Sequence, residues 1–205
     1  MGELSTQVVI IGGGPSGLLL SQLLHVCGSQ SVVLERKTKD YVLDRIQAGV
    51  LERGLLDLMR EARVADRMKR EGFTHDSTLI CYGNQMFRVD FKHHTSHSIM
   101  VYGQTEVTRD LYEAREKSGG EIVFNVEDVE IHDAKTNAPF ITYTKAGTGH
   151  QINCNFVAGC DGFHGISRKT IPQKVRKEYE KVYSFGWLGV LSETPPVGHE
   201  LIYAN

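Results

Sequence analysis

Three glycines near the N-terminus have the spacing of a phosphate-binding loop. Gly12, Gly14 and Gly17 form the pattern G-x-G-x-x-G. In such a loop the first glycine allows a tight turn and the second lets the backbone approach a pyrophosphate. The third lets the following helix pack closely on the strand. A helix that starts here directs N–H groups and a partial positive charge toward the phosphates. The glycines alone are a weak signal, so the prediction depends on what flanks them.

The flanking segments supply the required context. Residues 7–11 are a β-branched run typical of a buried parallel strand, and residues 16–26 are almost wholly apolar, as in a helix covered by a sheet. A second strand, residues 31–34, ends at Glu35, which stands 18 positions after Gly17, close to the spacing of a ribose-binding carboxylate. The loop is therefore predicted to bind the ADP moiety that NAD and FAD share, and the motif does not choose between them.

The composition excludes several other classes of function. With 205 residues, 40% hydrophobic and 23% charged, the chain resembles an ordinary globular protein with room for one large domain or the start of two. Lysine and arginine number 23 against 25 acidic residues, so bulk charge favours neither nucleic acid nor an anionic membrane as a partner. We identify no signal peptide and no membrane span, and we expect a cytoplasmic location.

The cysteines and histidines do not indicate a metal site. The four cysteines are scattered without a CxxC pair, which indicates neither a zinc site nor a disulfide framework. The densest histidine group, HHTSH at residues 93–97, is expected to be an exposed loop between two strands. We therefore expect no bound metal.

The middle of the chain alternates helical and strand patterns. Apolar residues from Val50 and Leu51 to Met59 recur at helical spacing. Residues 78–81 and 86–91 flank YGNQ, which predicts a hairpin. A helix is expected from Thr105 until two glycines stop it. Strands then follow at residues 122–126, 129–132, 140–145 and 150–155.

A second strand-to-glycine turn follows far downstream. Residues 156–159 form an apolar strand, and Asp161 and Gly162 come directly after it, before a short helical stretch. This turn is unusual for a simple nicotinamide dehydrogenase and suggests that the chain returns to the sheet beside the first loop. Residues 182–193 and 199–205 are then expected to form antiparallel strands separated by TPPVG.

Several segments, in this order, resemble the class A flavoprotein aromatic hydroxylases: GGGPSGLLL, LER, RIQAGVLE, VYGQTEVTRDL, GCDGFHGISR and FGWLG with HELIYAN. The resemblance extends over residues 7–205. It implies an α/β fold, with a Rossmann-like FAD-binding domain of the GR2 type interleaved with the start of a β-sheet substrate domain. The FAD-binding domain is expected at residues 1–75 and 101–180, and the substrate domain at residues 76–100 and 181–205.

The resemblance also implies which residues bind the cofactors: Gly12, Gly14, Ser16 and Gly17 (pyrophosphate), Glu35 (ribose), Arg45, Gln47, Ala48, Gly49, Val50 and Gln104 (FAD), Asp161 and Gly162 (the second fingerprint), and Arg36, His164 and Arg168 (the reduced pyridine nucleotide). The chain departs from the family at Gln47, where the family has an arginine that helps hold the pyrophosphates. Weaker cofactor binding is expected from this change. Preference for NADPH over NADH stays open, because Arg36 and Lys37 suit either a 2′-phosphate or a solvated face.

Two residues match the family's catalytic groups. Tyr203 corresponds to a tyrosine that hydrogen-bonds the substrate phenol and helps it lose its proton, which makes the ring a better nucleophile. His75 corresponds to a histidine that relays this proton to solvent, a role suited to a side chain that exchanges protons near neutral pH. The implied reaction uses NAD(P)H and O2 to hydroxylate para-hydroxybenzoate beside its phenol group, giving protocatechuate.

Alternatives stay open at this point. Family members are much longer, so the chain is expected to lack the residues that hold the substrate carboxylate. It could be a catalytically incomplete N-terminal fragment, or a relative that acts on another phenol. An NAD-dependent dehydrogenase is disfavoured by Asp161 and Gly162 and by the returning strands. The sequence does not indicate the oligomeric state, and a homodimer is one possibility.

Overall fold

The computed structural model describes residues 4–45, 49–186, 188–190, 192–195, 197–198 and 200–204. The chain divides into two compact units, the first made of Met1–Thr74 and Ile99–Thr170 and the second of His75–Ser98 and Ile171–Asn205. Each unit therefore contains two separate stretches of sequence. Residues 171–180 group with the second unit, whereas we expected them in the first.

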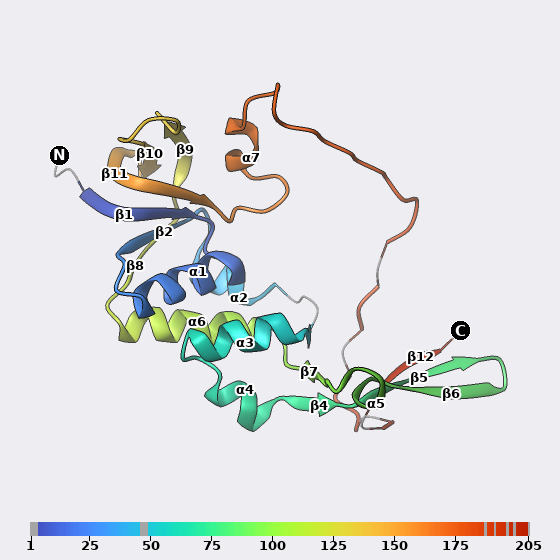
Figure 1. Ribbon diagram of the computed structural model, residues 1–205. Coiled ribbons are helices and arrows are strands. Elements are labelled where there is room, and N and C mark those ends of the chain that lie inside the picture. The colour runs from blue at the N-terminus through green and yellow to red at the C-terminus, as the bar shows by residue number, and fades with distance from the viewer. Residues whose placement is uncertain are drawn as a thin grey trace. The chain divides into compact units, whose positions relative to one another are not determined.

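A six-stranded sheet organises the first unit, with the strand order β8-β2-β1-β11-β10-β9 (Figure 1). The strands are β1 (Leu4–Ile11), β2 (Ser31–Glu35), β8 (Glu121–Phe124), β9 (Glu127–His132), β10 (Phe140–Lys145) and β11 (Thr148–Gly159). Strands β8, β2, β1 and β11 run parallel, and β10 and β9 continue the sheet in antiparallel order. The predicted α/β fold is thus present, with one glycine-containing turn after β1 and another after β11.

The strand register aligns the carboxyl ends of β1, β2 and β11. Ile11, the last residue of β1, lies beside Leu34 of β2 and beside Gly159 of β11. The backbone amide of Gly12 donates to the Leu34 carbonyl at 2.8 Å, and that of Cys160 donates to the Ile11 carbonyl at 2.7 Å. Both glycine-containing turns therefore leave the sheet at the same edge.

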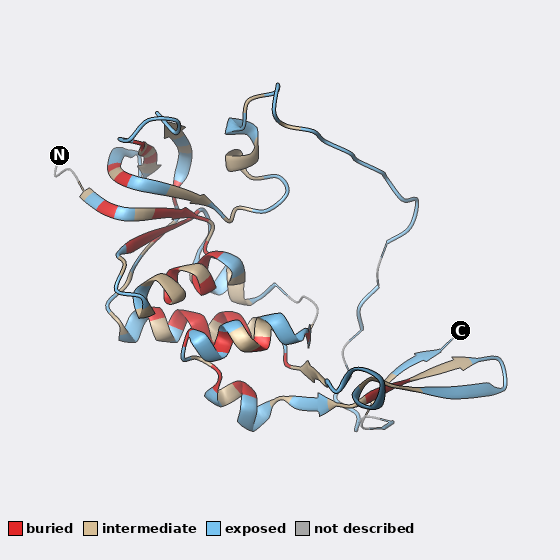
Figure 2. Cartoon of the chain, viewed as in Figure 1, coloured by how far each residue is buried: buried red, intermediate tan, exposed pale blue. Residues whose placement is uncertain are grey.

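The helices of the first unit are α1 (Pro15–Val26), α2 (Lys39–Leu43), α3 (Arg53–Glu61), α4 (Asp66–Glu71), α6 (Gln104–Lys117) and, after β11, α7 (Ile166–Thr170). Helices α1 and α6 share a core that includes Leu18, Leu111 and Tyr112. A second core around Val9 and Ile141 lies within the strands. Figure 2 shows the buried residues gathered on α1, α6 and the central strands.

The helical interpretation of residues 50–59 was wrong at its start. Val50 and Leu51 form strand β3, which pairs antiparallel with β7 (Ile99–Val101) in a small sheet that also contains β4 (Phe73–His75). Helix α3 begins only at Arg53. Pairing with a distant strand decided these two residues, although their spacing also fits a helix.

The expected break between residues 155 and 156 is also absent. Strand β11 is continuous over 12 residues. Its first part pairs with β10, and the stretch from Ile152 to Gly159 pairs with β1, so one strand carries both ladders. The antiparallel and parallel parts of the sheet are joined through this strand.

The second unit contains the predicted hairpin, β5 (Ser77–Tyr82) and β6 (Gln85–Asp90), followed by the short helix α5 (Phe91–Thr95). The histidine group begins within α5, and its side chains at His93 and His94 are exposed. Strand β12 (Leu201–Ala204) confirms a strand within residues 199–205, and its partner is β5, with which it pairs in parallel. Among the described residues of 182–193 there is no strand, so the expected antiparallel partner of 199–205 is absent there, and side chains such as Val182 and Leu188 are exposed.

Candidate dinucleotide-binding site

The glycine loop is shaped by close backbone packing. Gly12 has a φ of +111°, and a Cβ atom there would collide with the carbonyl of Cys160 at the end of β11. A Cβ at Gly17 would collide with the carbonyl of Gly12, so helix α1 can approach the loop only without a side chain there. Gly14 differs, because no atom lies within 4 Å of its missing Cβ. The open space at Gly14 is where a phosphate group can approach the backbone.

Gly13, which lies between Gly12 and Gly14, has a hydrogen-bond partner at both its amide and its carbonyl. The amide of Gly13 donates to Glu35 Oε2 at 2.7 Å, and its carbonyl accepts from the Tyr112 hydroxyl at 2.8 Å. Glu35 Oε1 accepts from the amide of Lys37 at 2.8 Å. Glu35 is buried, and each of its oxygens keeps a further acceptor position for a ligand hydroxyl. The carboxylate expected to bind ribose therefore also fixes the loop.

A cleft of about 190 Å³ lies against this loop. Eight of the predicted cofactor residues line it: Gly12, Gly14, Glu35, Arg36, Arg45, Gln104, Asp161 and Gly162. Lys37, which the sequence paired with Arg36 as a candidate for a 2′-phosphate, lines it as well. Tyr41, Thr105, Thr108 and Cys160 line it too, and our sequence interpretation did not assign them to the site. The N-terminus of α1 and the cations of Arg36, Lys37 and Arg45 suit an anionic group, so the residues present fit a pyrophosphate.

A larger cleft of about 360 Å³ adjoins the same strand ends and shares Gly12, Glu35, Arg36, Lys37 and Asp161 with the first. Its walls include the apolar side chains of Ile11, Leu34, Val126, Val129 and Ile166, with His164 also on the lining. An apolar slot beside a phosphate site suits a flat heterocycle.

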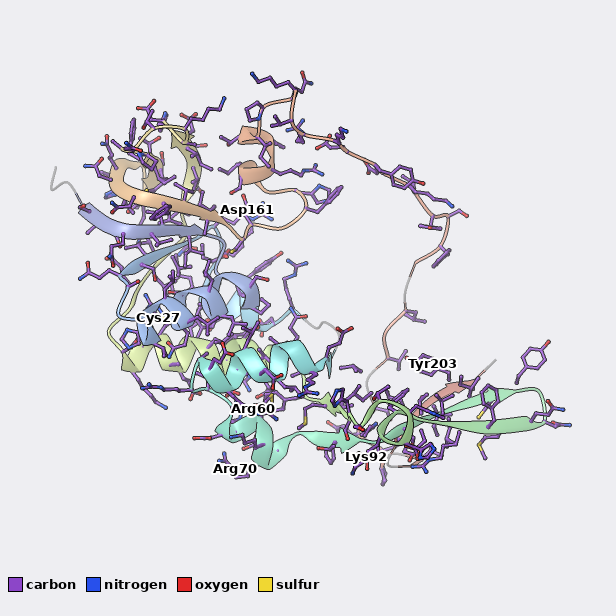
Figure 3. All side chains as sticks on the ribbon, viewed as in Figure 1. Cys27, Arg60, Arg70, Lys92, Asp161 and Tyr203 are labelled. Carbon is purple, nitrogen blue, oxygen red and sulfur yellow. The ribbon has the colours of Figure 1, made fainter. Side chains whose placement is uncertain are left out.

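The second fingerprint helps to build the turn after β11. Asp161 Oδ2 accepts a hydrogen bond of 2.9 Å from the amide of Ser167, in the first turn of α7. A Cβ at Gly165 would collide with the Asp161 carboxyl group, so the turn closes tightly around it. Figure 3 labels Asp161 where the chain leaves β11. Burial, and then the charge of Asp161, raise the pKa of the neighbouring Cys160 thiol, which keeps it uncharged.

Other predicted cofactor residues do not line either cleft. Ser16 is exposed in the first turn of α1. The carbonyl of Gly49 accepts from the amide of Tyr102 at 2.7 Å, and Val50 belongs to β3. The Arg168 guanidinium lies over the ring of Phe163 at 4.1 Å. Gln47 and Ala48 lie outside the described residues.

The two predicted catalytic residues belong to the second unit. Tyr203, labelled in Figure 3, lies on β12 beside Ile80 and is 64% exposed. The Nδ1 atom of His75 is buried and has no hydrogen-bond partner among the described residues.

The described residues contain no group of three or more His, Cys, Asp or Glu residues that could hold a metal ion. No helix in the described ranges is both long enough and apolar enough to cross a membrane.

Residues 5–205 match the family model described as an FAD binding domain. The chain is 48% identical over 206 aligned residues to p-hydroxybenzoate hydroxylase of Acinetobacter baylyi, covering 100% of this chain and 51% of that protein. It therefore spans about half the length of this relative.

Solved structures of flavoprotein monooxygenases share the fold. p-Nitrophenol 4-monooxygenase PnpA from Pseudomonas putida superposes with a TM-score of 0.71 at 21% identity, covering 82% of this chain and 43% of that one. PqsL from Pseudomonas aeruginosa, in complex with 2-aminobenzoylacetate, has a TM-score of 0.71 at 16% identity and covers 87% and 48%. The resemblance noted in the sequence is confirmed, and the chain belongs to the FAD-binding domain family.

Proposed function

We propose that this chain forms the FAD-binding part of a flavin-dependent aromatic hydroxylase that converts para-hydroxybenzoate to protocatechuate with NAD(P)H and O2. The observation that carries the proposal is the 48% identity, over its whole length, to a p-hydroxybenzoate hydroxylase. The proposed protein acts in the cytoplasm on a small aromatic substrate, without nucleic acid or membrane partners.

In this proposal the two clefts of the first unit hold the FAD. The smaller cleft takes the pyrophosphate against Gly14 and the N-terminus of α1, with Arg45 as a countercharge. Glu35 accepts a hydrogen bond from a ribose hydroxyl, and the larger apolar cleft takes the adenine. When bound, FAD supplies the redox chemistry that reduces dioxygen with electrons from the nicotinamide nucleotide.

The chain's own residues then bind, orient and exchange protons. Arg36, His164 and Arg168 are proposed to bind the reduced pyridine nucleotide, and a 2′-phosphate would meet the cations of Arg36 and Lys37. The Tyr203 hydroxyl is proposed to hydrogen-bond the substrate phenol and help it lose its proton, and His75 is proposed to relay that proton to solvent. Orientation of the ring and exclusion of water complete the protein's part.

A second candidate is that the chain binds FAD but needs further polypeptide for catalysis. The share of the relative that it spans, 51%, favours this reading. A relative that acts on a phenol other than para-hydroxybenzoate is the third.

The visible absorbance spectrum of the purified chain, before and after addition of FAD, tests the proposal. Flavin bands that remain after gel filtration and shift on addition of para-hydroxybenzoate are expected from the proposed hydroxylase. Retained flavin with no shift supports the second candidate, and a shift with a different phenol supports the third. A chain that stays colourless with added FAD overturns FAD binding by these residues.

A further inference from the structure

We propose that Tyr112 is a positioning residue for the phosphate-binding loop: its hydroxyl holds the carbonyl of Gly13 so that the following amide, that of Gly14, faces the cofactor. The inference goes beyond the residues that the family resemblance assigned to the site, which do not include Tyr112. It rests on the proposed placement of the FAD pyrophosphate at Gly14.

The contact joins two distant parts of the chain. Tyr112 belongs to α6, 99 residues from Gly13, and its hydroxyl donates to the Gly13 carbonyl at 2.8 Å. Its side chain is fully buried. The ring lies 5.8 Å from that of Phe124, and the Lys39 ammonium stands over it at 5.5 Å. The hydroxyl is therefore delivered by a ring whose position is fixed by packing.

The geometry of the peptide unit gives this contact its consequence. In a trans peptide the carbonyl oxygen and the next amide hydrogen point in opposite directions. The described peptide bonds of the chain include no cis bond. When Tyr112 holds the Gly13 carbonyl on the α6 side, the Gly14 amide is turned away from Tyr112. Gly14 lines the smaller cleft and has open space beside it.

Glu35 holds Gly13 at its amide, as Tyr112 does at its carbonyl. The Gly13 amide is bound to Glu35 Oε2, and a Cβ at Gly13 would stand 2.8 Å from the Glu35 Cβ. With Tyr112 on the carbonyl and Glu35 on the amide, neither peptide plane around Gly13 is free to rotate. Burial, and then the negative charge of Glu35, raise the pKa of Tyr112, so its hydroxyl keeps the proton that it donates.

A purely structural role would also explain a buried tyrosine in the core. The two roles differ in what the hydroxyl alone contributes. Tyr112→Phe keeps the ring and its packing and removes only the donor to Gly13. Tyr102→Phe is a matched control, because Tyr102 is also buried in the first unit and its hydroxyl donates to Asp110 at 2.8 Å, away from the loop.

The test compares the wild-type chain of residues 1–205 with these two variants. Flavin fluorescence titration gives the FAD dissociation constant, and hydrogen exchange without FAD gives the protection of residues 12–18 relative to β1. We expect Tyr112→Phe to weaken FAD binding about tenfold, since a buried carbonyl loses its donor. We also expect the loop to exchange about tenfold faster while β1 is unchanged, and Tyr102→Phe to stay within about twofold of wild type.

Three results would overturn the inference. They are unchanged loop exchange in Tyr112→Phe, equal effects of the two substitutions on the loop, and faster exchange in β1 and the loop together, which indicates a general loss of stability. If the wild-type chain fails to bind FAD, the cofactor assignment fails. The exchange comparison still decides whether Tyr112 holds the loop.

Discussion

The backbone amide of Gly13 and the carboxylate of Glu35, 22 positions apart, are joined by a buried hydrogen bond of 2.7 Å. The bond connects the glycine turn after β1 to the end of the neighbouring strand β2. Because Glu35 also accepts from Lys37, a single carboxylate contacts the turns after β1 and after β2, both of which border the smaller cleft. A carboxylate thus lies in a site for an anionic ligand, where backbone N–H donors stabilise it.

Glu35→Gln is expected to destabilise the chain and weaken FAD binding. A glutamine side chain offers one acceptor oxygen and one amide group, so one of the two backbone amides would face another donor. An unsatisfied buried amide costs about 1–3 kcal/mol. Urea unfolding and flavin titration measure the two effects. Glu61→Gln, on the exposed end of α3, is the control, and equal behaviour of the two variants would contradict the assignment.

Gly17→Ala and Gly14→Ala are expected to separate folding from cofactor binding. At Gly17 a methyl group collides with the Gly12 carbonyl, and overpacking of this kind costs about 1–3 kcal/mol, so the thermal midpoint should fall. At Gly14 the backbone is extended, with φ −77° and ψ −179°, and the space is open, so alanine should fold normally. Its methyl group would instead occupy the approach to the phosphate and weaken FAD binding. A Gly14→Ala chain with wild-type FAD affinity would refute this placement.

Gln47→Arg is expected to tighten cofactor binding. The resemblance places an arginine at this position, and Gln47 lies outside the described residues. A hydrogen bond to a charged partner contributes about 1.5–3 kcal/mol, which corresponds to roughly tenfold or more in affinity. Flavin titration of the variant against wild type measures it, with Gln30→Arg, on the loop before β2, as a control for added charge. No gain in affinity for FAD or NADPH would remove Gln47 from the site.

Glu200 and Arg88 are expected to make the second unit sensitive to acid. The Arg88 guanidinium donates to Glu200 Oε1 at 2.6 Å, and this hydrogen bond, followed by one from Ser77, holds the pKa of Glu200 below its usual 4.5. A lowered pKa in the folded state means that the stabilisation is full above pH 4.5 and is lost as the pH falls through the lowered value. Glu200→Gln should therefore be less stable than wild type at pH 7 and approach it in acid. Urea unfolding at several pH values checks this, with Glu193→Gln as the exposed control. A stability difference that persists unchanged in acid would contradict it.

The first βαβ unit was predictable because its signals are local. The β-branched run before Gly12, the apolar helix after Pro15 and the strand that ends at Glu35 each follow from neighbouring residues, and the structure confirms all three. The hairpin around YGNQ was predictable for the same reason. Residues 50–51 were not, because they form a strand only through pairing with residues 100–101.

The residues of the site also divide into those that local sequence patterns predicted and those that only tertiary contacts placed there. The sequence by itself pointed to the glycines and Glu35, since the close contact between Gly17 and the Gly12 carbonyl arises from the local backbone path of a strand, turn and helix. Only the tertiary structure brought Tyr112 from α6 to the Gly13 carbonyl and set the end of β11 against Gly12. It also decided that β12 pairs in parallel with β5. Local patterns fix which element forms, whereas these contacts depend on how distant elements pack, and no spacing within one segment encodes that.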